Sequence, residues 1–204
     1  FDRTVQNGWG SADKGGAWTT TDGAPVSVAD GAGIVPLDHV GWTTAATLKD
    51  FSAPQAQVST TFTLSETPSE RGVYTTVIPR RTDSGYYGVK VVADKSGVTA
   101  FLIAVDGKTE TNLASTRLPD SWSAGTPIHV VVSATGSGTT SLSATVWTGD
   151  GAAPQTPTVT AEDSTASLQG NGSVGLQSYL STSSTSVTGQ LRVDEFSATS
   201  NPAK

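Results

Sequence analysis

The sequence contains no cysteine and no methionine among its 204 residues. Without cysteine, the chain can form no disulfide, no Cys-ligated zinc site and no thiol nucleophile. Charged residues make up only 15% of the chain and hydrophobic residues 35%, so Ser, Thr, Gly, Asn and Gln must cover most of its surface. A surface of neutral hydroxyl and amide groups suits a neutral ligand, or no ligand at all.

Basic clusters and long apolar runs are also missing. The formal net charge is −6 and the only adjacent basic pair is Arg80-Arg81, whereas nucleic-acid phosphates require clustered Lys and Arg. No apolar run approaches the roughly 20 residues of a membrane helix. We therefore expect neither nucleic-acid binding nor membrane insertion. The chain begins with Phe1 rather than Met, which together with the missing cysteines favours an exported, extracellular protein.

Turn signals are abundant, and in the middle of the chain they recur at about the spacing of short strands in a β-sandwich. They separate short runs rich in Val, Thr, Ile, Phe and Tyr, and no window has helical periodicity. The pattern predicts an all-β, two-sheet antiparallel β-sandwich with roughly six strands in each sheet. We expect one domain over residues 1–199 and a tail or linker over residues 200–204. The turn signals are Asp30-Gly31, Asp83-Ser84-Gly85, Lys95-Ser96-Gly97, Asp106-Gly107, Gly136-Ser137-Gly138 and Gly149-Asp150-Gly151.

Alternation within the strands assigns side chains to the core or to the outside. The run 97–105 is apolar on both sides, which predicts a central strand, and Pro79 predicts an edge or a bulge in the strand 72–80. The residues predicted to point inward are Val58, Thr60, Phe62, Leu64, Tyr87, Val89, Val91, Ile128, Val130, Val132, Leu142, Ala144, Val146, Val174, Leu176 and Leu180.

The segment 172–197, "GSVGLQSYLSTSSTSVTGQLRVDEFS", reads as two antiparallel strands around a Ser/Thr-rich loop. This "G-x-V-G-L … V-D-x-F" ending resembles concanavalin A-like and related jelly-roll domains, which often bind sugars. The segment 1–20, "FDRTVQNGWGSADKGGAWTT", resembles the start of domains found beside polysaccharide-active modules, and in phage tail proteins, of high-GC Gram-positive bacteria. We expect Trp9 and Trp18 to close one end of the core, each with its indole N–H bonded to a loop carbonyl.

Three aromatic residues fall on polar strand faces by alternation, namely Tyr86, Tyr179 and Trp147. The apolar face of a pyranose ring stacks on such aromatic rings, while side chains of Arg, Gln or Asp bond its hydroxyls. Ordinary cross-strand pairing on a solvated face is the alternative interpretation. The complete candidate ligand site consists of Tyr74, Arg80, Tyr86, Lys90, Trp147, Gln177 and Tyr179.

The resemblance to jelly-roll carbohydrate-binding modules also implies a structural calcium ion near the chain ends. Asp194 on the last strand would be one ligand and Asp2 the second, with Asp22 or Asp30 as substitutes for Asp2. Calcium needs six to eight oxygens, so backbone carbonyls would complete the shell. The alternative is an exposed acidic pair, Asp194-Glu195, or an ion pair with Arg3 or Arg192.

Catalytic motifs are not evident. Sandwich-type retaining glycosidases carry two carboxylates on one strand, in the pattern E-x-D-x-x-E, and this pattern does not occur. His39 and His129 have no hydrolase or metalloprotease context. The sequence thus predicts a non-catalytic carbohydrate-binding module, tethered to a secreted polysaccharide-active enzyme and binding a neutral or weakly acidic polysaccharide or oligosaccharide. The alternative is a structural or adhesive domain of a cell-surface or phage tail protein.

Overall fold

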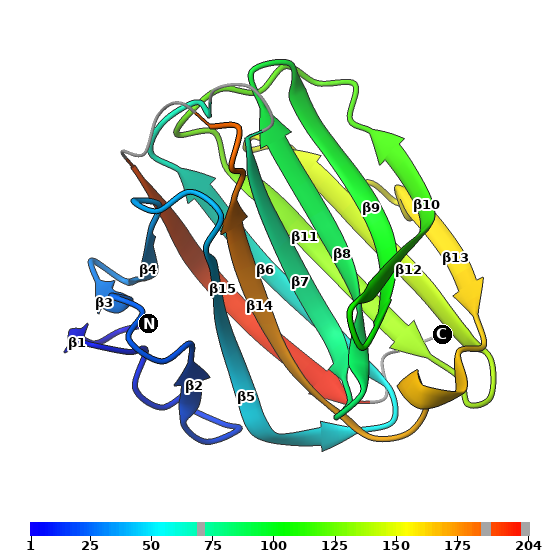
Figure 1. Ribbon diagram of the computed structural model, residues 1–204. Helices are drawn as coiled ribbons and strands as arrows, with labels where there is room; N and C mark the ends of the chain where they lie inside the picture. Colours follow the sequence, from blue (N-terminus) through cyan, green and yellow to red (C-terminus); the bar gives the residue numbers. More distant parts are fainter. Residues whose placement is uncertain (69–71, 185–188, 201–204) are drawn as a thin grey trace.

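The computed structural model describes residues 1–68, 72–184 and 189–200, which form two antiparallel sheets packed face to face (Figure 1). The predicted all-β sandwich is therefore confirmed, with more strands than the expected six per sheet. In spatial order, the eight-stranded sheet consists of β1 (Val5–Gln6), β3 (Ser27–Ala29), β4 (Ala32–Pro36), β15 (Gln190–Ser200), β6 (Ala56–Leu64), β11 (Ile128–Thr135), β12 (Thr140–Thr148) and β13 (Val159–Asp163).

The second sheet has seven strands and lies in front in Figure 1. Within the described residues, the only helical element is one 3-10 turn, η1 (Ala166–Leu168), and no helix there is long and apolar enough to cross a membrane. In spatial order, the seven-stranded sheet consists of β10 (Thr109–Arg117), β9 (Gly97–Asp106), β8 (Gly85–Asp94), β7 (Val73–Arg81), β14 (Gly172–Leu180), β5 (Thr43–Ala53) and β2 (Trp18–Thr20).

The core lies between the two sheets, and every residue predicted to point inward is buried there. In β6, for example, Val58, Phe62 and Leu64 alternate with half-buried residues. This period of two arises because successive side chains of a strand leave the sheet on opposite faces. The strand β9, predicted to be central, lies between β8 and β10 and is buried on both faces at Leu102 and Ile103.

Pro79 lies inside β7, between β8 and β14, so the predicted bulge is confirmed and the predicted edge is not. The register with β8 shifts between Val77 and Arg80. A bulge adds one residue to one strand and so inverts the alternation beyond it. Arg80 consequently pairs with the inward-facing Tyr87, and Arg81 pairs with Tyr86.

The two chain ends share the eight-stranded sheet but do not pair with each other. The last strand, β15, pairs with β4 and β6, while β1 lies beyond β3 and β4. A sandwich of this kind predicts that the N- and C-terminal segments lie adjacent in one sheet. This is confirmed for β4 and β15, whereas β1 itself is not a neighbour of β15. β15 ends at Ser200, and residues 201–204 of the predicted tail lie outside the described residues.

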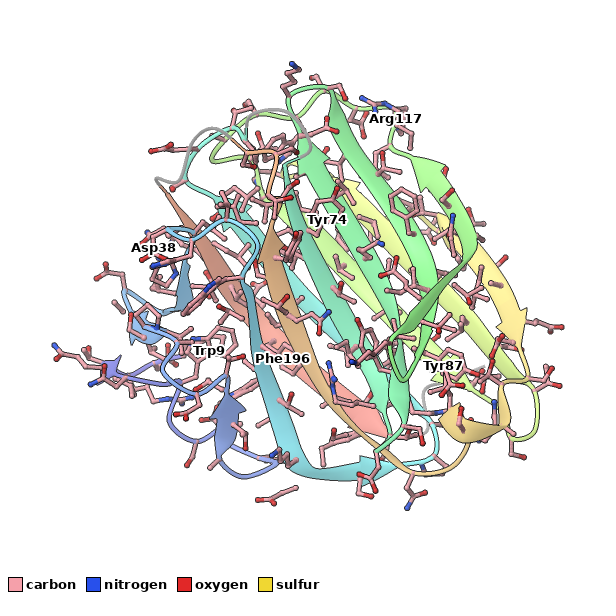
Figure 2. All side chains as sticks on the ribbon, in the orientation of Figure 1. Trp9, Asp38, Tyr74, Tyr87, Arg117 and Phe196 are labelled. Carbon is pink, nitrogen blue, oxygen red and sulfur yellow. The ribbon has the colours of Figure 1, made fainter. Side chains whose placement is uncertain are left out.

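Aromatic side chains close the end of the sandwich where Trp9 and Phe196 are labelled in Figure 2. Phe1, Trp9, Trp18 and Phe196 form successive edge-to-face contacts, with ring centroids 5.4, 5.2 and 4.9 Å apart. We call these four residues the aromatic ladder. Trp9 is fully buried, as predicted, but its indole Nε1 has no hydrogen-bond partner. The predicted bond from Trp9 to a loop carbonyl is wrong.

Candidate functional site

A groove of about 650 Å³ opens on the outer face of the seven-stranded sheet. It contains four of the seven residues predicted to bind a ligand, namely Tyr74, Lys90, Gln177 and Tyr179. We call it the tyrosine groove. Its lining residues are Thr43, Tyr74, Thr76, Lys90, Glu110, Gln177, Tyr179, Ser181, Thr182 and Ser183.

Two tyrosines from neighbouring strands form the aromatic part of the groove. Tyr74 on β7 stands directly opposite Tyr179 on β14, and their ring centroids are 5.7 Å apart at an interplanar angle of 68°. Both side chains are half-buried. Figure 2 shows Tyr74 on the front of the sheet, near one end of β7. The edge-to-face contact holds the rings in fixed orientations, so a flat apolar ligand would meet a rigid surface.

A charged pair adds polar groups to the groove. Lys90 Nζ on β8 forms an ion pair with the Glu110 carboxylate on β10, although β9 lies between these strands. Lys90 Nζ also lies 5.9 Å from the centre of the Tyr74 ring. The contact across β9 places the β10 side chain over the sheet face. Hydroxyl and amide groups of Thr76, Gln177 and the Ser181–Ser183 loop line the rest of the groove.

Tyr86 lies on the predicted outer face but is only 8% exposed, so its assignment as an open stacking surface is wrong. It packs in a small apolar cluster with Ile78 and Ile103. Its hydroxyl accepts a hydrogen bond of 2.8 Å from Gln177 Nε2, and the Arg81 guanidinium lies 4.6 Å from its ring centre. Burial raises the pKa of the Tyr86 hydroxyl, although the Arg81 charge opposes this shift. Tyr86 therefore holds Gln177, a residue of the tyrosine groove, in place and does not itself stack on a ligand.

Arg80 is absent from the groove because the Pro79 bulge turns it into the core. The side chain is 1% exposed, and its Nη1 donates a 2.7 Å hydrogen bond to Thr140 Oγ1 on the opposite sheet. Its Nη2 donates to the carbonyls of Pro54 and Gly136. Burial lowers the pKa of this guanidinium. The prediction of Arg80 as a ligand residue is wrong, and Arg81 occupies the outer face in its place.

Trp147 lies on β12 of the other sheet, so it does not join the predicted ligand site. Its ring stacks on His129, with centroids 4.7 Å apart, and its Nε1 donates a 3.1 Å hydrogen bond to the Gly151 carbonyl. His129 also bonds the Thr61 hydroxyl and the Gly149 carbonyl. These contacts tie the loop after β12 to the sheet, which is a structural role.

The two acids predicted to bind calcium, Asp2 and Asp194, are both exposed. Nowhere in the described ranges do three His, Cys, Asp or Glu side chains gather as metal ligands do. The Asp194 carbonyl accepts a 2.8 Å hydrogen bond from Thr60 Oγ1, and Thr61 Oγ1 donates to the Glu195 carboxylate. Calcium requires six to eight oxygens, so an ion at Asp2 or Asp194 would depend mainly on backbone carbonyls and water, and no cluster of acidic side chains in the described residues supports it.

Sequence reasoning missed several residues of the groove, including Thr43, Thr76, Glu110 and the Ser181–Ser183 loop. Thr76 shares the alternation of Tyr74 and could have been found from it. Glu110 could not, because its proximity to Lys90 depends on how β10 curls over the sheet. Trp42 was also missed: it is 54% exposed and stacks on His39 with centroids 4.8 Å apart.

A second, larger hollow of about 760 Å³ runs beside the aromatic ladder. Its aromatic walls include Phe1, Trp18 and Phe196, and the rings of Trp18 and Phe196 already contact each other edge to face. Those contacts join segments from both ends of the chain. This hollow is the larger of the two, but the tyrosine groove combines half-exposed rings with hydrogen-bonding side chains, which is the chemistry that a sugar site requires.

No model of a known protein family matches this sequence, and no curated protein sequence matches it. Solved structures do share its fold. A carbohydrate-binding module from Bacillus subtilis is 14% identical, with a TM-score of 0.52 and coverage of 97% of this chain and 94% of that chain. The exoplasmic/lumenal domain of VIP36, in a form bound to Ca²⁺ and Man3GlcNAc, is 10% identical, with a TM-score of 0.58 and coverages of 92% and 85%.

The same fold also occurs as part of a longer chain. A xylan beta-1,4-xylosidase from Bacillus halodurans is 13% identical with a TM-score of 0.54, and the match covers 82% of this chain but 32% of the xylosidase. At these identities, the similarities show the jelly-roll fold that this chain shares with carbohydrate-binding modules and lectin-like domains.

Proposed function

We propose that this chain is a non-catalytic carbohydrate-binding module that holds a glycan in the tyrosine groove. The observation that carries the proposal is the pairing of Tyr74 and Tyr179 in an open hollow among hydroxyl, amide and charged side chains. Aromatic rings bury the apolar face of a sugar at a small cost in side-chain entropy. The polar side chains around them match the hydroxyls at the edge of the same ring.

The contacts that the polar side chains of the groove already make indicate their roles in binding a sugar. Gln177 already donates to Tyr86 and accepts from Arg81, so its position is fixed before a ligand arrives. The Lys90 ammonium and the Glu110 carboxylate supply one donor group and one acceptor group side by side. A sugar with adjacent hydroxyls would bond both groups at once.

The remaining parts of the proposal are that the chain is not an enzyme, is extracellular and is tethered to a polysaccharide-active catalytic domain. Among the described residues that line the groove, Glu110 is the only carboxylate, whereas glycosidases use a pair. Attachment to an enzyme is supported by the xylosidase, because its fold match covers about a third of that chain. The cysteine-free, Ser/Thr-rich composition supports the extracellular location.

The test is affinity electrophoresis of the whole chain against plant, algal and fungal polysaccharides. We expect at least one polysaccharide to retard the wild-type chain, and Tyr179→Ala to abolish that retardation. Trp147→Ala is the matched control, because it removes an aromatic ring from the outer face of the other sheet and should bind normally. Equal loss in both variants would place the site elsewhere. No retardation by any polysaccharide would favour a structural or adhesive domain.

A further inference from the structure

A third hollow, of about 700 Å³, lies on the same sheet face as the tyrosine groove, toward the other end of the strands. Lys49, Arg81 and Asp83 supply its charged groups. We call it the cationic hollow. Its lining residues are Thr47, Lys49, Phe51, Ser52, Arg81, Thr82, Asp83, Ser84, Ser167, Gln169, Asn171, Gly172 and Ser173.

The two hollows are joined through Gln177. This residue lines the tyrosine groove, and its Oε1 accepts a 3.2 Å hydrogen bond from Arg81 Nη2, which belongs to the cationic hollow. Along β14, the stretch from Tyr179 to Ser173 spans roughly 20 Å at the rise of an extended strand. This length accommodates several sugar units of one glycan chain.

The charge of the cationic hollow differs from that of the groove. In the groove, Glu110 neutralises Lys90. In the cationic hollow, two cations face the single acid Asp83, and within the described part of the chain neither Lys49 nor Arg81 forms an ion pair. A net positive hollow on a chain of net charge −6 is a local reversal of sign.

Arg81 is also held ready for a ligand. Its guanidinium lies over the Tyr86 ring, 4.6 Å from the ring centre, and the hydrogen bond from its Nη2 to Gln177 fixes the orientation of the guanidinium plane. Its Nε is buried and therefore closed to a ligand, whereas among the described residues only Nη2 makes a hydrogen bond and the donors of Nη1 stay unused. A planar guanidinium with unused donors matches the two oxygens of a carboxylate better than it matches a single hydroxyl.

We propose that the cationic hollow binds the carboxylate of a uronic acid in the same glycan chain that occupies the tyrosine groove. Arg81 pairs with the carboxylate oxygens, and Lys49 adds a second positive charge from β5. The ligand is then an acidic polysaccharide with aromatic stacking at one end and a charge contact at the other. This inference rests on the proposed function of the groove.

The experiment compares acidic polysaccharides with their carboxyl-reduced forms. Polygalacturonate, alginate, glucuronoxylan and hyaluronate are the probes, each measured against its reduced partner by affinity electrophoresis and calorimetry. We expect at least one carboxylated form to bind more tightly than its reduced form, and added NaCl to weaken only the carboxylated one. Equal affinity of the two forms for every bound probe would overturn the proposal.

Charge variants locate the contact. Lys49 is exposed, so Lys49→Gln should leave the fold intact and weaken binding of the carboxylated form about twofold to fivefold. Arg81→Gln should weaken it about tenfold, with partial rescue by Arg81→Lys. Lys108→Gln is the matched control, because Lys108 lies in the exposed turn between β9 and β10. An unchanged affinity in Lys49→Gln and Arg81→Gln would overturn the proposal.

The outcomes separate this inference from the proposed function. If Tyr179→Ala abolishes binding while carboxyl reduction has no effect, the groove is correct and the cationic hollow is not a carboxylate site. If carboxylated glycans bind through Lys49 but Tyr179→Ala binds normally, the cationic hollow stands and the groove fails. If no glycan binds, both proposals fail.

Discussion

The aromatic ladder and the tyrosine groove both contain aromatic rings packed edge to face, but their surroundings differ. In the ladder, Trp9 is fully buried between Phe1 and Trp18, and Phe196 from the other end of the chain contacts Trp18. In the groove, Tyr74 and Tyr179 come from adjacent strands and remain half-exposed beside polar side chains. The same edge-to-face geometry thus closes the core in the ladder and forms part of an open surface in the groove.

The difference shows that burial and polar neighbours, more than ring geometry, distinguish the closed ladder from the proposed ligand site. Rings that are already buried have released their hydration water on folding and contribute to stability. Half-exposed rings still contact water, so they gain most when a ligand covers them. Variants in the two clusters should therefore affect different measurements.

The largest effect is expected from Trp9→Ala, which removes a buried indole from the ladder. We expect the free energy of unfolding to fall by about 3–5 kcal/mol, the range for large buried aromatic residues. Glycan affinity of the folded fraction should not change. Urea unfolding followed by fluorescence measures the first quantity and calorimetry the second.

Gly33→Ala is an independent check on the ladder. A Cβ atom at Gly33 would lie 2.8 Å from two atoms of the Trp9 ring, so alanine at this position should also destabilise the chain. A wild-type stability in both Trp9→Ala and Gly33→Ala would show that the ladder does not close the core.

Tyr74→Ala should have the opposite pattern to Trp9→Ala, with a large loss of glycan affinity and a small loss of stability. We expect glycan affinity to fall at least about 30-fold, which corresponds to roughly 2 kcal/mol for a central aromatic contact. The free energy of unfolding should fall by only about 1 kcal/mol, mainly from the lost contact with Tyr179. Tyr74→Phe keeps the ring and should retain most of the affinity. If Tyr74→Ala costs as much stability as Trp9→Ala, the two clusters do not differ as described.

The fold could be predicted from the sequence because its signals are local. Alternation in β6, β11, β12 and β14 identifies the inner faces, and the turn residues mark where each strand ends. Pro79 likewise predicts an edge or a bulge, and the bulge is the one that forms. The direction in which Arg80 leaves the strand depends on which residues β8 places opposite it, and this long-range register is not encoded in the residues around Pro79.

The candidate site was predictable only in part for the same reason. The alternation gives the face of Tyr86, Tyr179 and Trp147 but not the sheet to which each strand belongs, so Trp147 was placed with the wrong neighbours. Alternation also cannot show what covers an outer face. Tyr86 is covered by its apolar cluster and by Arg81, which approach it only in the folded chain.

Tyr87 differs from the rings of both clusters, because its ring is buried in the core while its hydroxyl makes hydrogen bonds. Its hydroxyl donates a 2.6 Å hydrogen bond to Asp163 Oδ1 and accepts one of 3.1 Å from Gln169 Nε2. Burial opposes ionisation of Asp163, but the hydrogen bonds from Tyr87 and the Thr165 backbone outweigh it and lower the pKa of the carboxyl. We expect Tyr87→Phe to lower the free energy of unfolding by about 1 kcal/mol at neutral pH.

The pH dependence of Tyr87→Phe distinguishes this bond from packing. Because the pKa of Asp163 is lower in the folded state, its contribution to stability is present above about pH 4 and is lost as the pH falls through the lowered pKa. The difference in stability between wild type and Tyr87→Phe should shrink as the pH falls below 4. A difference that is constant from pH 7 to pH 2 would assign the effect to packing alone.

The smallest effect is expected from removing metal. It tests whether an ion adds to the contacts that the ladder and the β4–β15 pairing make between the two ends of the chain. A calcium ion present at one hundred times its dissociation constant would add about 2.7 kcal/mol to the stability of the folded state. For a chain of this size, that is roughly 5–10 °C in the melting temperature. Because no cluster of three His, Cys, Asp or Glu side chains includes Asp2 or Asp194 among the described residues, we expect EDTA to change the melting temperature by less than about 1 °C. A drop of several degrees that is restored by calcium, and is absent in Asp194→Asn, would show that a metal ion shares the role of the ladder.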